Sequence, residues 1–374
     1  MIKRQIEDLI NNHTGKGKAV IILGARQVGK TTVLEKMFSD RKDVLWLDGD
    51  EPQVKAAFQN ISSDRLKAII GDHKVLVIDE AQNIEEVGQK LKLVTDLIKD
   101  VQLIVSGSSS FELADKLNEP LTGRKREFNL YPVSYKEMSE HHGLLKESGM
   151  LKHRLVYGYY PETVTSPGKE KKVLKELLNS YLYKDVLKWG KLKKSERILK
   201  LLQAIAFQVG NEVSYSELGT ITGLDKQTVE SYIQLLEQAF VVFRLGAFSR
   251  NLRKELSRSR KIYFYDNGIR NALINNYSDI DLREDRGKLW ENFLISERIK
   301  YLNYSELWVS QYFWRTYDQQ EIDYIEESDG QFSAYEFKWN ARKNYKIPEI
   351  FKKEYKVRNT EIITPENFEN FVGV

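Results

Sequence analysis

Short runs of consecutive apolar residues, separated by stretches with helical spacing, dominate roughly the first third of the chain. The runs lie at residues 19–23, 44–47, 75–78 and 103–105. Unalternated apolar runs of this kind, with helices between them, are typical of parallel strands that are buried on both faces. We therefore expect an α/β domain with a parallel sheet over residues 1–133.

The pattern changes three times further along the chain. Charged stretches with Leu and Tyr at helical spacing predict a small helical lid over residues 134–192. A helix-turn-helix pattern followed by an apolar run predicts a winged-helix-like module over residues 193–252. Strand-like runs then return and predict a second α/β domain over residues 253–374.

Composition narrows the class of protein. The chain has 374 residues, of which 41% are hydrophobic, so it can form several cores, and its apolar runs stay well short of the roughly 20 residues that span a bilayer. With zero cysteines, disulfides, thiolate metal sites and thiol catalysis are excluded. Residues 1–7 lack the apolar stretch of a secretion signal. We expect a soluble, cytoplasmic protein without membrane contact.

A glycine-rich loop follows the first apolar run and precedes a helical pattern. It fits G-x-x-x-x-G-K-[ST] and consists of Gly24, Ala25, Arg26, Gln27, Val28, Gly29, Lys30, Thr31 and Thr32. Its backbone N–H groups and the following helix N-terminus suit phosphates, while Lys30 would reach the β- and γ-phosphate oxygens and Thr31 would face Mg²⁺. The loop predicts an ATP site.

Two carboxylates end the third apolar run. Asp79 and Glu80 follow Val75–Ile78 directly. At the carboxyl end of a buried parallel strand they would face the nucleotide. We expect Asp79 to orient Mg²⁺ and Glu80 to act as general base on the attacking water.

Two further residues are candidates for the ATP site. Ser108 follows the fourth apolar run and would sense the γ-phosphate, although a Ser that caps the next helix fits the same pattern. Arg124 would serve as an arginine finger for a neighbouring subunit, and a solvated basic loop is the alternative.

The order of these parts resembles an AAA+ ATPase. Asp79-Glu80-Ala81-Gln82, Gly107-Ser108-Ser109-Ser110, Gly123-Arg124 and Tyr131-Pro132-Val133-Ser134-Tyr135 are similar to bacterial and archaeal ATPases that carry a fused C-terminal domain of unassigned function. Further matches lie at residues 158–162, 181–185 and 261–268. The resemblance implies an ATPase core, a winged helix and a restriction-endonuclease-like tail.

A second group of charged residues lies near the C-terminus. Glu336 and Lys338 alternate along one strand, and a hairpin through Asp329-Gly330 would bring Asp323 beside them. The arrangement resembles the PD-(D/E)xK nuclease pattern, although Ile322 stands where that pattern has proline.

This resemblance implies that Asp323 and Glu336 hold a second divalent metal while Lys338 positions or activates water. We expect Glu291 to add a third carboxylate, with Glu297 as the alternative. An exposed hairpin with ordinary charge pairs, or a nuclease fold kept as a binding platform, would give the same pattern.

Basic residues are concentrated locally, because the whole chain carries only +4. The cluster that follows the winged-helix pattern consists of Arg250, Arg253, Lys254, Arg258 and Arg260. It would neutralise DNA phosphates, whereas a solvated loop is the alternative. The helix over 225–231 has two acids for one base, which argues against strong sequence reading by that helix. Recognition of DNA structure is therefore expected, and a module used for packing or subunit contact is the alternative.

Together these features predict an ATP-hydrolysing protein that processes DNA, with branched or structured DNA as the expected substrate. A homo-oligomer, for which a hexamer is one option, would supply Arg124 in trans. The alternative is an ATP-dependent regulatory switch with a vestigial nuclease fold and no DNA chemistry.

Overall fold

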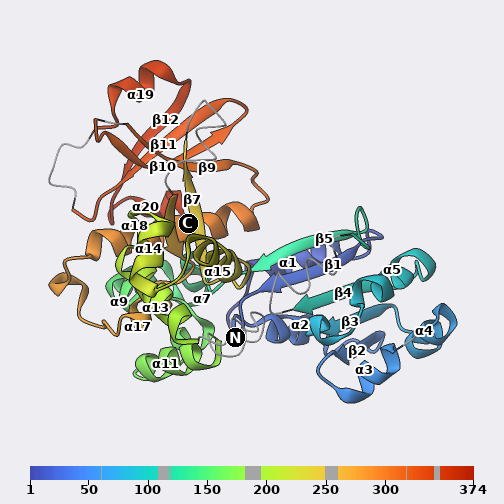
Figure 1. Ribbon diagram of the computed structural model, residues 1–374. Coiled ribbons are helices and arrows are strands. Elements are labelled where there is room, and N and C mark those ends of the chain that lie inside the picture. Colours follow the sequence, from blue (N-terminus) through green and yellow to red (C-terminus); the bar gives the residue numbers. More distant parts are fainter. Residues whose placement is uncertain are drawn as a thin grey trace. The chain divides into compact units, whose positions relative to one another are not determined.

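The computed structural model describes residues 1–59, 61–107, 117, 119–181, 195–248, 260–316, 318–340 and 346–374. It divides into two compact units (Figure 1). The N-terminal unit comprises Met1–Pro132 with Gln238–Phe240, and the C-terminal unit comprises Val133–Glu237 with Val241–Val374.

The N-terminal unit is built on a five-stranded sheet with the order β2-β3-β4-β1-β5, in which every pair is parallel. Its elements are α1 (Gln5–His13), β1 (Ala19–Gly24), α2 (Lys30–Phe38), β2 (Val44–Asp48), α3 (Pro52–Phe58), α4 (Ser63–Ile70), β3 (Val75–Asp79), η1 (Ala81–Asn83), α5 (Val87–Leu97), β4 (Gln102–Gly107) and β5 (Lys125–Leu130).

The four apolar runs of the N-terminal unit form strands β1 to β4, so the predicted parallel sheet is confirmed. Every residue of β1 and of β3 is buried, as expected for strands that are covered on both faces. Since β4 lies between β3 and β1, the carboxyl ends of these three strands share one edge. The P-loop, Asp79 and Glu80 lie at that edge, because β1 ends at Gly24 and β3 ends at Asp79.

The C-terminal unit contains a seven-stranded mixed sheet with the order β12-β11-β10-β9-β7-β8-β6. Its elements are α7 (Tyr135–His142), α8 (Leu144–Gly149), α9 (Leu151–Tyr157), α10 (Pro161–Thr165), α11 (Glu170–Tyr181), α13 (Ser195–Phe207), β6 (Glu212–Val213), α14 (Tyr215–Thr222), α15 (Lys226–Gln238), β7 (Val242–Ala247), β8 (Arg260–Phe264), α17 (Asn267–Leu273), η3 (Ile280–Leu282), α18 (Arg286–Tyr304), β9 (Ser310–Arg315), β10 (Glu321–Ser328), β11 (Gln331–Phe337), α19 (Glu349–Glu354), β12 (Val357–Ile363) and α20 (Phe368–Phe371).

One sheet joins the helix-turn-helix region to the C-terminal strands. Strand β7 pairs antiparallel with β8 and parallel with β9, and β6 pairs with β8. The backbone hydrogen bonds of β7 are therefore satisfied by strands that the sequence assigns to the next domain. Apart from Gln238–Phe240, the ranges predicted as lid, winged helix and nuclease-like domain lie within one compact unit.

The predicted hairpin through Asp329-Gly330 is confirmed. Strands β10 and β11 pair antiparallel, with Ser328 opposite Gln331. Asp329 and Gly330 both adopt positive φ, 52° and 73°, as a two-residue hairpin turn requires. Because Tyr324 is opposite Tyr335, the preceding residue, Asp323, comes beside Glu336.

Helix α18 is fixed against the sheet by hydrogen bonds from Asn292. This side chain is fully buried, accepts from the N–H of Phe264 at 2.7 Å and donates to the carbonyl of the same residue at 3.0 Å. The paired contact holds α18 beside β8. It places Glu291, the preceding residue, toward the strands.

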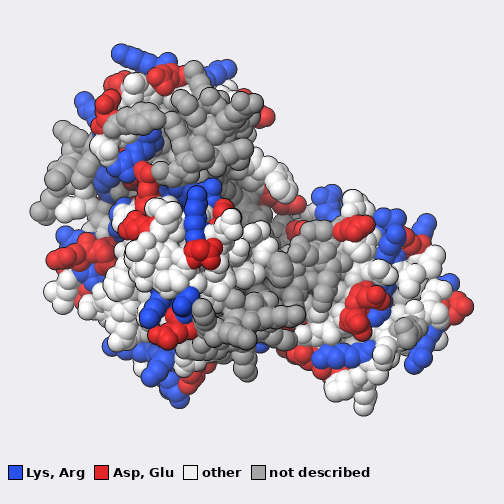
Figure 2. All heavy atoms as spheres, in the orientation of Figure 1, with Lys and Arg blue, Asp and Glu red and all other residues white. Residues whose placement is uncertain are grey.

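Charged side chains are distributed over both units. On the face in Figure 2, Lys and Arg side chains are interspersed with Asp and Glu side chains among the described residues. This mixture agrees with the formal net charge of +4. Within the part of the chain that the structure describes, no helix is long and apolar enough to cross a membrane.

Candidate ATP site and C-terminal carboxylate cluster

The P-loop is wrapped around its own lysine. Lys30 is 5% exposed, and its Nζ donates to the carbonyls of Gly24 at 3.0 Å and Ala25 at 2.8 Å. Gly29 has φ 94°, in the left-handed region, directly before α2. This turn ends the loop at the N-terminus of α2, where backbone N–H groups are available for an anion.

The residues predicted to face Mg²⁺ contact each other. The hydroxyl of Thr31 donates to Oδ2 of Asp79 at 2.6 Å, and Asp79 is 4% exposed. The hydroxyl of Ser106 donates to Oδ1 of the same carboxylate. The contact between Ser106 and Asp79 was not predicted, because only the order of β3 and β4 in the sheet shows that these two residues are neighbours.

Glu80 lies in a tightly fixed turn after β3. It adopts φ 47°, its N–H donates to Oδ1 of Asp79 at 3.0 Å, and its Oε2 accepts from the amide of Gln82 at 2.5 Å. A Cβ at Gly49 would lie 2.5 Å from the carbonyl oxygen of Glu80, so glycine is required beside this turn. Gln82 therefore orients the predicted general base.

Ser108 and Arg124 are the two remaining candidates for the ATP site. Ser108 lies outside the described residues. Arg124 precedes β5, whose first residue pairs with Ala19 at the start of β1, and its Nε donates to Asp96 at 2.5 Å. Arg124 is thus at the opposite end of β1 from the P-loop. A finger that reaches a neighbouring subunit stays a prediction.

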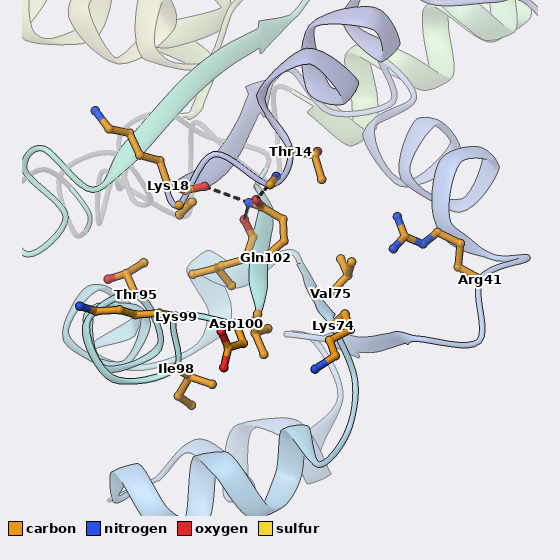
Figure 3. Close-up of a pocket in the computed structure, with 15 residues that line it drawn as sticks. Thr14, Lys18, Arg41, Lys74, Val75, Thr95, Ile98, Lys99, Asp100 and Gln102 are labelled. Atoms are coloured by element: carbon orange, nitrogen blue, oxygen red, sulfur yellow. Dashed lines mark hydrogen bonds between the residues drawn. The ribbon is translucent and has the colours of Figure 1, made fainter.

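A pocket of about 420 Å³ lies at that opposite end (Figure 3). Ala19, Val75 and Leu103 line it, at the starts of β1, β3 and β4. Gln102 closes one side by donating to the carbonyl of Lys18 and accepting from the N–H of Gly15. The pocket is separate from the P-loop, which begins at the last residue of β1.

In the C-terminal unit, the three residues of the nuclease-like pattern come together. Nζ of Lys338 lies 2.5 Å from Oε1 of Glu336 and 3.6 Å from Oδ2 of Asp323. Oδ2 of Asp323 also accepts from the N–H of Phe337 at 2.8 Å. The hairpin register therefore does bring Asp323, Glu336 and Lys338 into one cluster.

This cluster is rich in negative charge. Burial, together with the charges of Glu291 and Glu336, raises the pKa of Asp323 to about 7. Oε2 of Glu336 is buried and has no hydrogen-bond partner in the structure described. Both observations indicate carboxylates whose charge is incompletely compensated.

Glu291 faces the same cluster, but basic and hydroxyl groups hold its carboxylate. Oε1 lies 3.2 Å from Nζ of Lys261 and accepts from the hydroxyl of Tyr263 at 2.6 Å, while Oε2 lies 3.3 Å from Nζ of Lys288. Burial alone would raise the pKa of Glu291, but these two lysines lower it below its ordinary value.

Lys261 is the member of the cluster that was not predicted. Its side chain is 1% exposed, and its Nζ also lies 2.6 Å from Oε1 of Glu321. In the sequence it appears only as one of many basic residues beside a strand. Glu291 of α18, Glu321 of β10 and the ring of Phe313 on β9 surround its ammonium.

The alternative third carboxylate, Glu297, belongs to another network. It accepts from Nζ of Lys300 at 2.6 Å and from the N–H of Tyr135 at 2.7 Å. Among the residues that the structure describes, no three His, Cys, Asp or Glu side chains lie so that they could hold one metal ion.

The acids of α15 are paired with arginines of the sheet. Glu230 lies 3.4 Å from Arg260, and Glu237 lies 2.5 Å from Arg244. Both arginines also donate to the hydroxyl of Tyr215. Of the predicted DNA-binding residues, Arg260 is thus tied to α14 and α15, and Arg250, Arg253, Lys254 and Arg258 lie outside the described residues.

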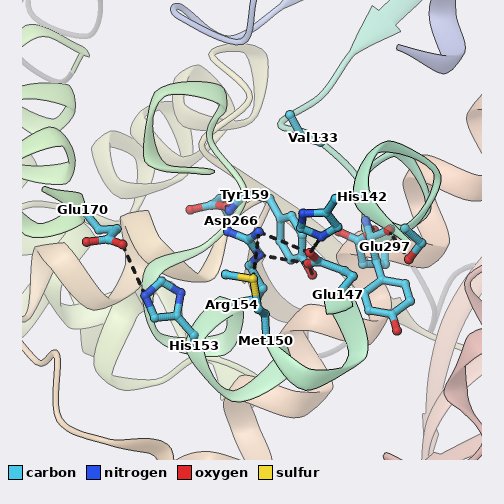
Figure 4. Close-up of polar contacts among 12 residues, drawn as sticks. Val133, His142, Glu147, Met150, His153, Arg154, Tyr159, Glu170, Asp266 and Glu297 are labelled. Atoms are coloured by element: carbon cyan, nitrogen blue, oxygen red, sulfur yellow. Dashed lines mark hydrogen bonds and ion pairs between the residues drawn. The ribbon is translucent and has the colours of Figure 1, made fainter. Parts of the chain in front are cut away.

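Two segments that carry the family resemblance pack against each other in the C-terminal unit. The carboxylate of Asp266 accepts a hydrogen bond from the N–H of Tyr159 at 2.6 Å. A Cβ at Gly158 would collide with the carboxylate of Asp266. In Figure 4 the neighbouring Glu147 pairs with Arg154 and with His142. His142 has a side chain only 15% exposed, so it is part of this partly buried group.

Comparison with known families divides the chain into three matched ranges. Residues 16–139 match the model of an AAA domain, residues 148–279 match a domain of unknown function (DUF8612), and residues 286–370 match another (DUF4143). Residues 16–139 are an AAA-type P-loop ATPase domain. The DUF4143 match lies C-terminal to it in the same chain.

Two uncharacterized relatives align with most of the chain. An uncharacterized protein of Mycobacterium tuberculosis is 24% identical over 86% of this chain and 70% of its own length. An uncharacterized protein of Methanocaldococcus jannaschii is 24% identical over 79% of this chain and 69% of its own length.

A Walker-type ATPase of Pyrococcus abyssi covers 73% of this chain and 96% of its own at 15% identity, with a TM-score of 0.50. At that identity the likeness concerns the fold alone.

Proposed function

We propose that the AAA domain hydrolyses ATP with Lys30, Thr31, Asp79 and Glu80 as its working residues. The observation that carries this proposal is the contact of Thr31 with Asp79 at 2.6 Å, beside a Glu80 that Gln82 holds in place. Lys30 would release its contacts to the loop carbonyls and bind the β- and γ-phosphates. Glu80 would accept a proton from a water molecule while the oxygen of that water attacks the γ-phosphorus and ADP leaves.

The residues at this site fit a Mg²⁺ ion. The hydroxyl of Thr31 and the carboxylate of Asp79 are hard oxygen ligands, and they meet at the start of α2 where the phosphates would lie. When bound with ATP, Mg²⁺ would neutralise charge on the phosphoryl oxygens. Ser106 orients the other carboxylate oxygen of Asp79.

Two variants test these roles. Lys30→Ala removes the phosphate-binding ammonium and is expected to weaken nucleotide binding. Glu80→Gln keeps a side-chain oxygen for Gln82, so nucleotide binding should persist while turnover falls by about 10²-fold or more. Titration with a fluorescent ATP analogue and release of inorganic phosphate measure the two effects. Equal turnover in Glu80→Gln and wild type would contradict the assignment of the base.

A second candidate function is action on DNA by the C-terminal unit. One observation favours it, namely the assembly of Asp323, Glu336 and Lys338 from two strands into a charged cluster, as in the nuclease pattern. Local basic residues, among them Arg260, would contact the DNA backbone. ATP hydrolysis would then drive the processing of branched or structured DNA by a homo-oligomer.

The cluster fits a metal ion only in part. The carboxylates of Asp323 and Glu336 could serve as metal ligands. Oε2 of Glu336 is buried without a hydrogen-bond partner in the structure described. Glu291 does not fit, because Lys261, Tyr263 and Lys288 occupy both of its oxygens. We therefore assign no cleavage step to this site.

The decisive experiment measures the ATPase rate with single-stranded, duplex, forked and four-way DNA. Stimulation by one of these forms would support DNA processing and identify the substrate. If no form stimulates hydrolysis or binds at low salt, the alternative is favoured, a regulatory switch with a vestigial nuclease fold. Cleavage with Mg²⁺ or Mn²⁺ that is lost in Asp323→Ala and Lys338→Ala would support the nuclease site.

A further inference from the structure

Arg4 contacts the P-loop from a segment that precedes the AAA domain match. The match begins at residue 16, whereas Arg4 lies directly before α1 and is 5% exposed. Its Nη1 donates to the carbonyl of Val28 at 2.8 Å, and its Nη2 donates to the carbonyl of Tyr131 at 2.7 Å. One guanidinium therefore joins the middle of the P-loop to the residue after β5.

The same segment also forms hydrogen bonds with α2, the helix that follows the P-loop. Glu7 accepts two hydrogen bonds from Nζ of Lys36, at 2.7 and 2.8 Å, and Lys36 lies on α2. Oε1 of Glu7 further accepts from the N–H of Arg4 at 2.8 Å. Arg4 and Glu7 are thus linked to each other, and they reach both the loop and its helix.

The contact with Val28 has a consequence for the phosphate site. In a trans peptide the C=O and the following N–H point in opposite directions. When Arg4 holds the carbonyl of Val28, it also directs the N–H of Gly29 to the other side of the loop. Gly29 has φ 94°, and a Cβ there would lie 3.7 Å from Nη1 of Arg4, so the guanidinium packs against this turn.

We propose that Arg4 is a positioning residue for the nucleotide, which presets the P-loop so that the N–H of Gly29 faces the phosphates. The inference rests on the proposed binding of ATP at Lys30 and Thr31. Arg4 acts through the peptide unit between Val28 and Gly29 and does not itself touch the nucleotide. Preorganisation of this kind lowers the cost of binding, because the loop does not have to find the binding conformation.

The experiment compares full-length wild type, Arg4→Ala, Arg4→Lys and Lys3→Ala. Lys3 provides a matched control, since it is the adjacent cation and its ion pair with Asp8 is largely exposed. We would measure the Kd of a fluorescent ATP analogue with Mg²⁺, KM and kcat for ATP hydrolysis, and the Tm of the nucleotide-free protein.

Arg4→Ala is expected to weaken nucleotide binding about tenfold or more, the equivalent of one charge-assisted hydrogen bond. The change should appear in Kd and KM more than in kcat. Arg4→Lys should recover only part of the affinity, because an ammonium cannot match the planar guanidinium that donates to the carbonyls of both Val28 and Tyr131. Lys3→Ala should bind as wild type does.

The outcomes separate this inference from the function on which it rests. If wild type does not bind ATP, the proposed function fails. If wild type binds ATP and a folded Arg4→Ala binds it equally well, the positioning role is wrong. Should Arg4→Ala not fold, Arg4→Lys decides, because wild-type affinity in that variant would overturn the role and a several-fold loss would support it.

Discussion

At the scale of single residues, buried charges of the C-terminal unit are compensated by specific neighbours. Lys261 is the clearest case, since its ammonium lies between Glu291 and Glu321 with 1% of the side chain exposed. A buried ion pair contributes little by itself, but removal of one partner leaves an uncompensated charge in a place that water does not reach. Lys261 therefore stabilises the unit chiefly by neutralising Glu291.

Lys261→Met is expected to destabilise the C-terminal unit by about 1 to 3 kcal/mol, because Glu291 loses one of its two ammonium partners and keeps Lys288. Glu291→Gln should also destabilise it, whereas the double variant should lose less than the sum of the two changes. Urea unfolding of the four proteins measures the coupling. Additive losses would show that the two side chains do not compensate each other.

At the scale of elements, the start of α18 is held by a cluster of two arginines and one aspartate. Asp285 precedes the helix and lies 2.5 Å from Arg270 of α17 and 2.8 Å from Arg283. Burial alone would raise the pKa of Asp285, but the hydrogen bond from Arg283 and the charge of Arg270 lower it to about 2. The cluster thus joins α17 to α18, the helix that carries Glu291.

The lowered pKa predicts acid sensitivity. A carboxylate with a folded pKa of about 2 and an ordinary value of 3.8 stabilises the fold above about pH 4 and loses that contribution between pH 4 and 2. The contribution is about 2 kcal/mol. Asp285→Asn should be less stable at neutral pH, and its free energy of unfolding should change less with pH in this window.

Asp281→Asn is the matched control for that experiment. Asp281 pairs with Lys152, and both side chains are more than half exposed. We expect this variant to change stability by less than about 0.5 kcal/mol. An equal loss in the two variants would contradict a special role of Asp285.

At the scale of the whole molecule, a weak net charge restricts how the chain would bind DNA. The chain carries +4, and Figure 2 shows mixed signs on the face in view. Binding would therefore depend on local contacts, for which the sequence predicts Arg250, Arg253, Lys254, Arg258 and Arg260. General electrostatic attraction is a poor source of affinity here.

These five contacts set an upper limit on the salt dependence of DNA affinity. Each neutralised phosphate contributes about −0.9 to the slope of log K against log salt, so between 50 and 200 mM salt the affinity should fall by roughly 10²- to 10³-fold. A binding titration at several salt concentrations measures the slope. A slope near zero would exclude phosphate contacts by this cluster.

Much of the N-terminal unit was predictable because its signals are local. Four apolar runs determine β1 to β4, and the P-loop motif requires its residues to be consecutive. The hairpin at Asp329-Gly330 is likewise local, since those two residues favour the positive φ that the turn needs. The contacts of Ser106, Gln82 and Arg4 were not predicted, as they depend on which strands and helices become neighbours.

The sequence by itself determined the ATP-binding loop, the parallel sheet beneath it and the spacing that brings Asp323, Glu336 and Lys338 together, because each depends on residues close in the chain. Only the tertiary structure decided what surrounds these residues. It joined β7 and β8 to the C-terminal strands, buried Lys261 beside Glu291, and brought Arg4 to the P-loop. Such contacts join residues far apart in the chain, and their burial follows from packing that no short pattern specifies.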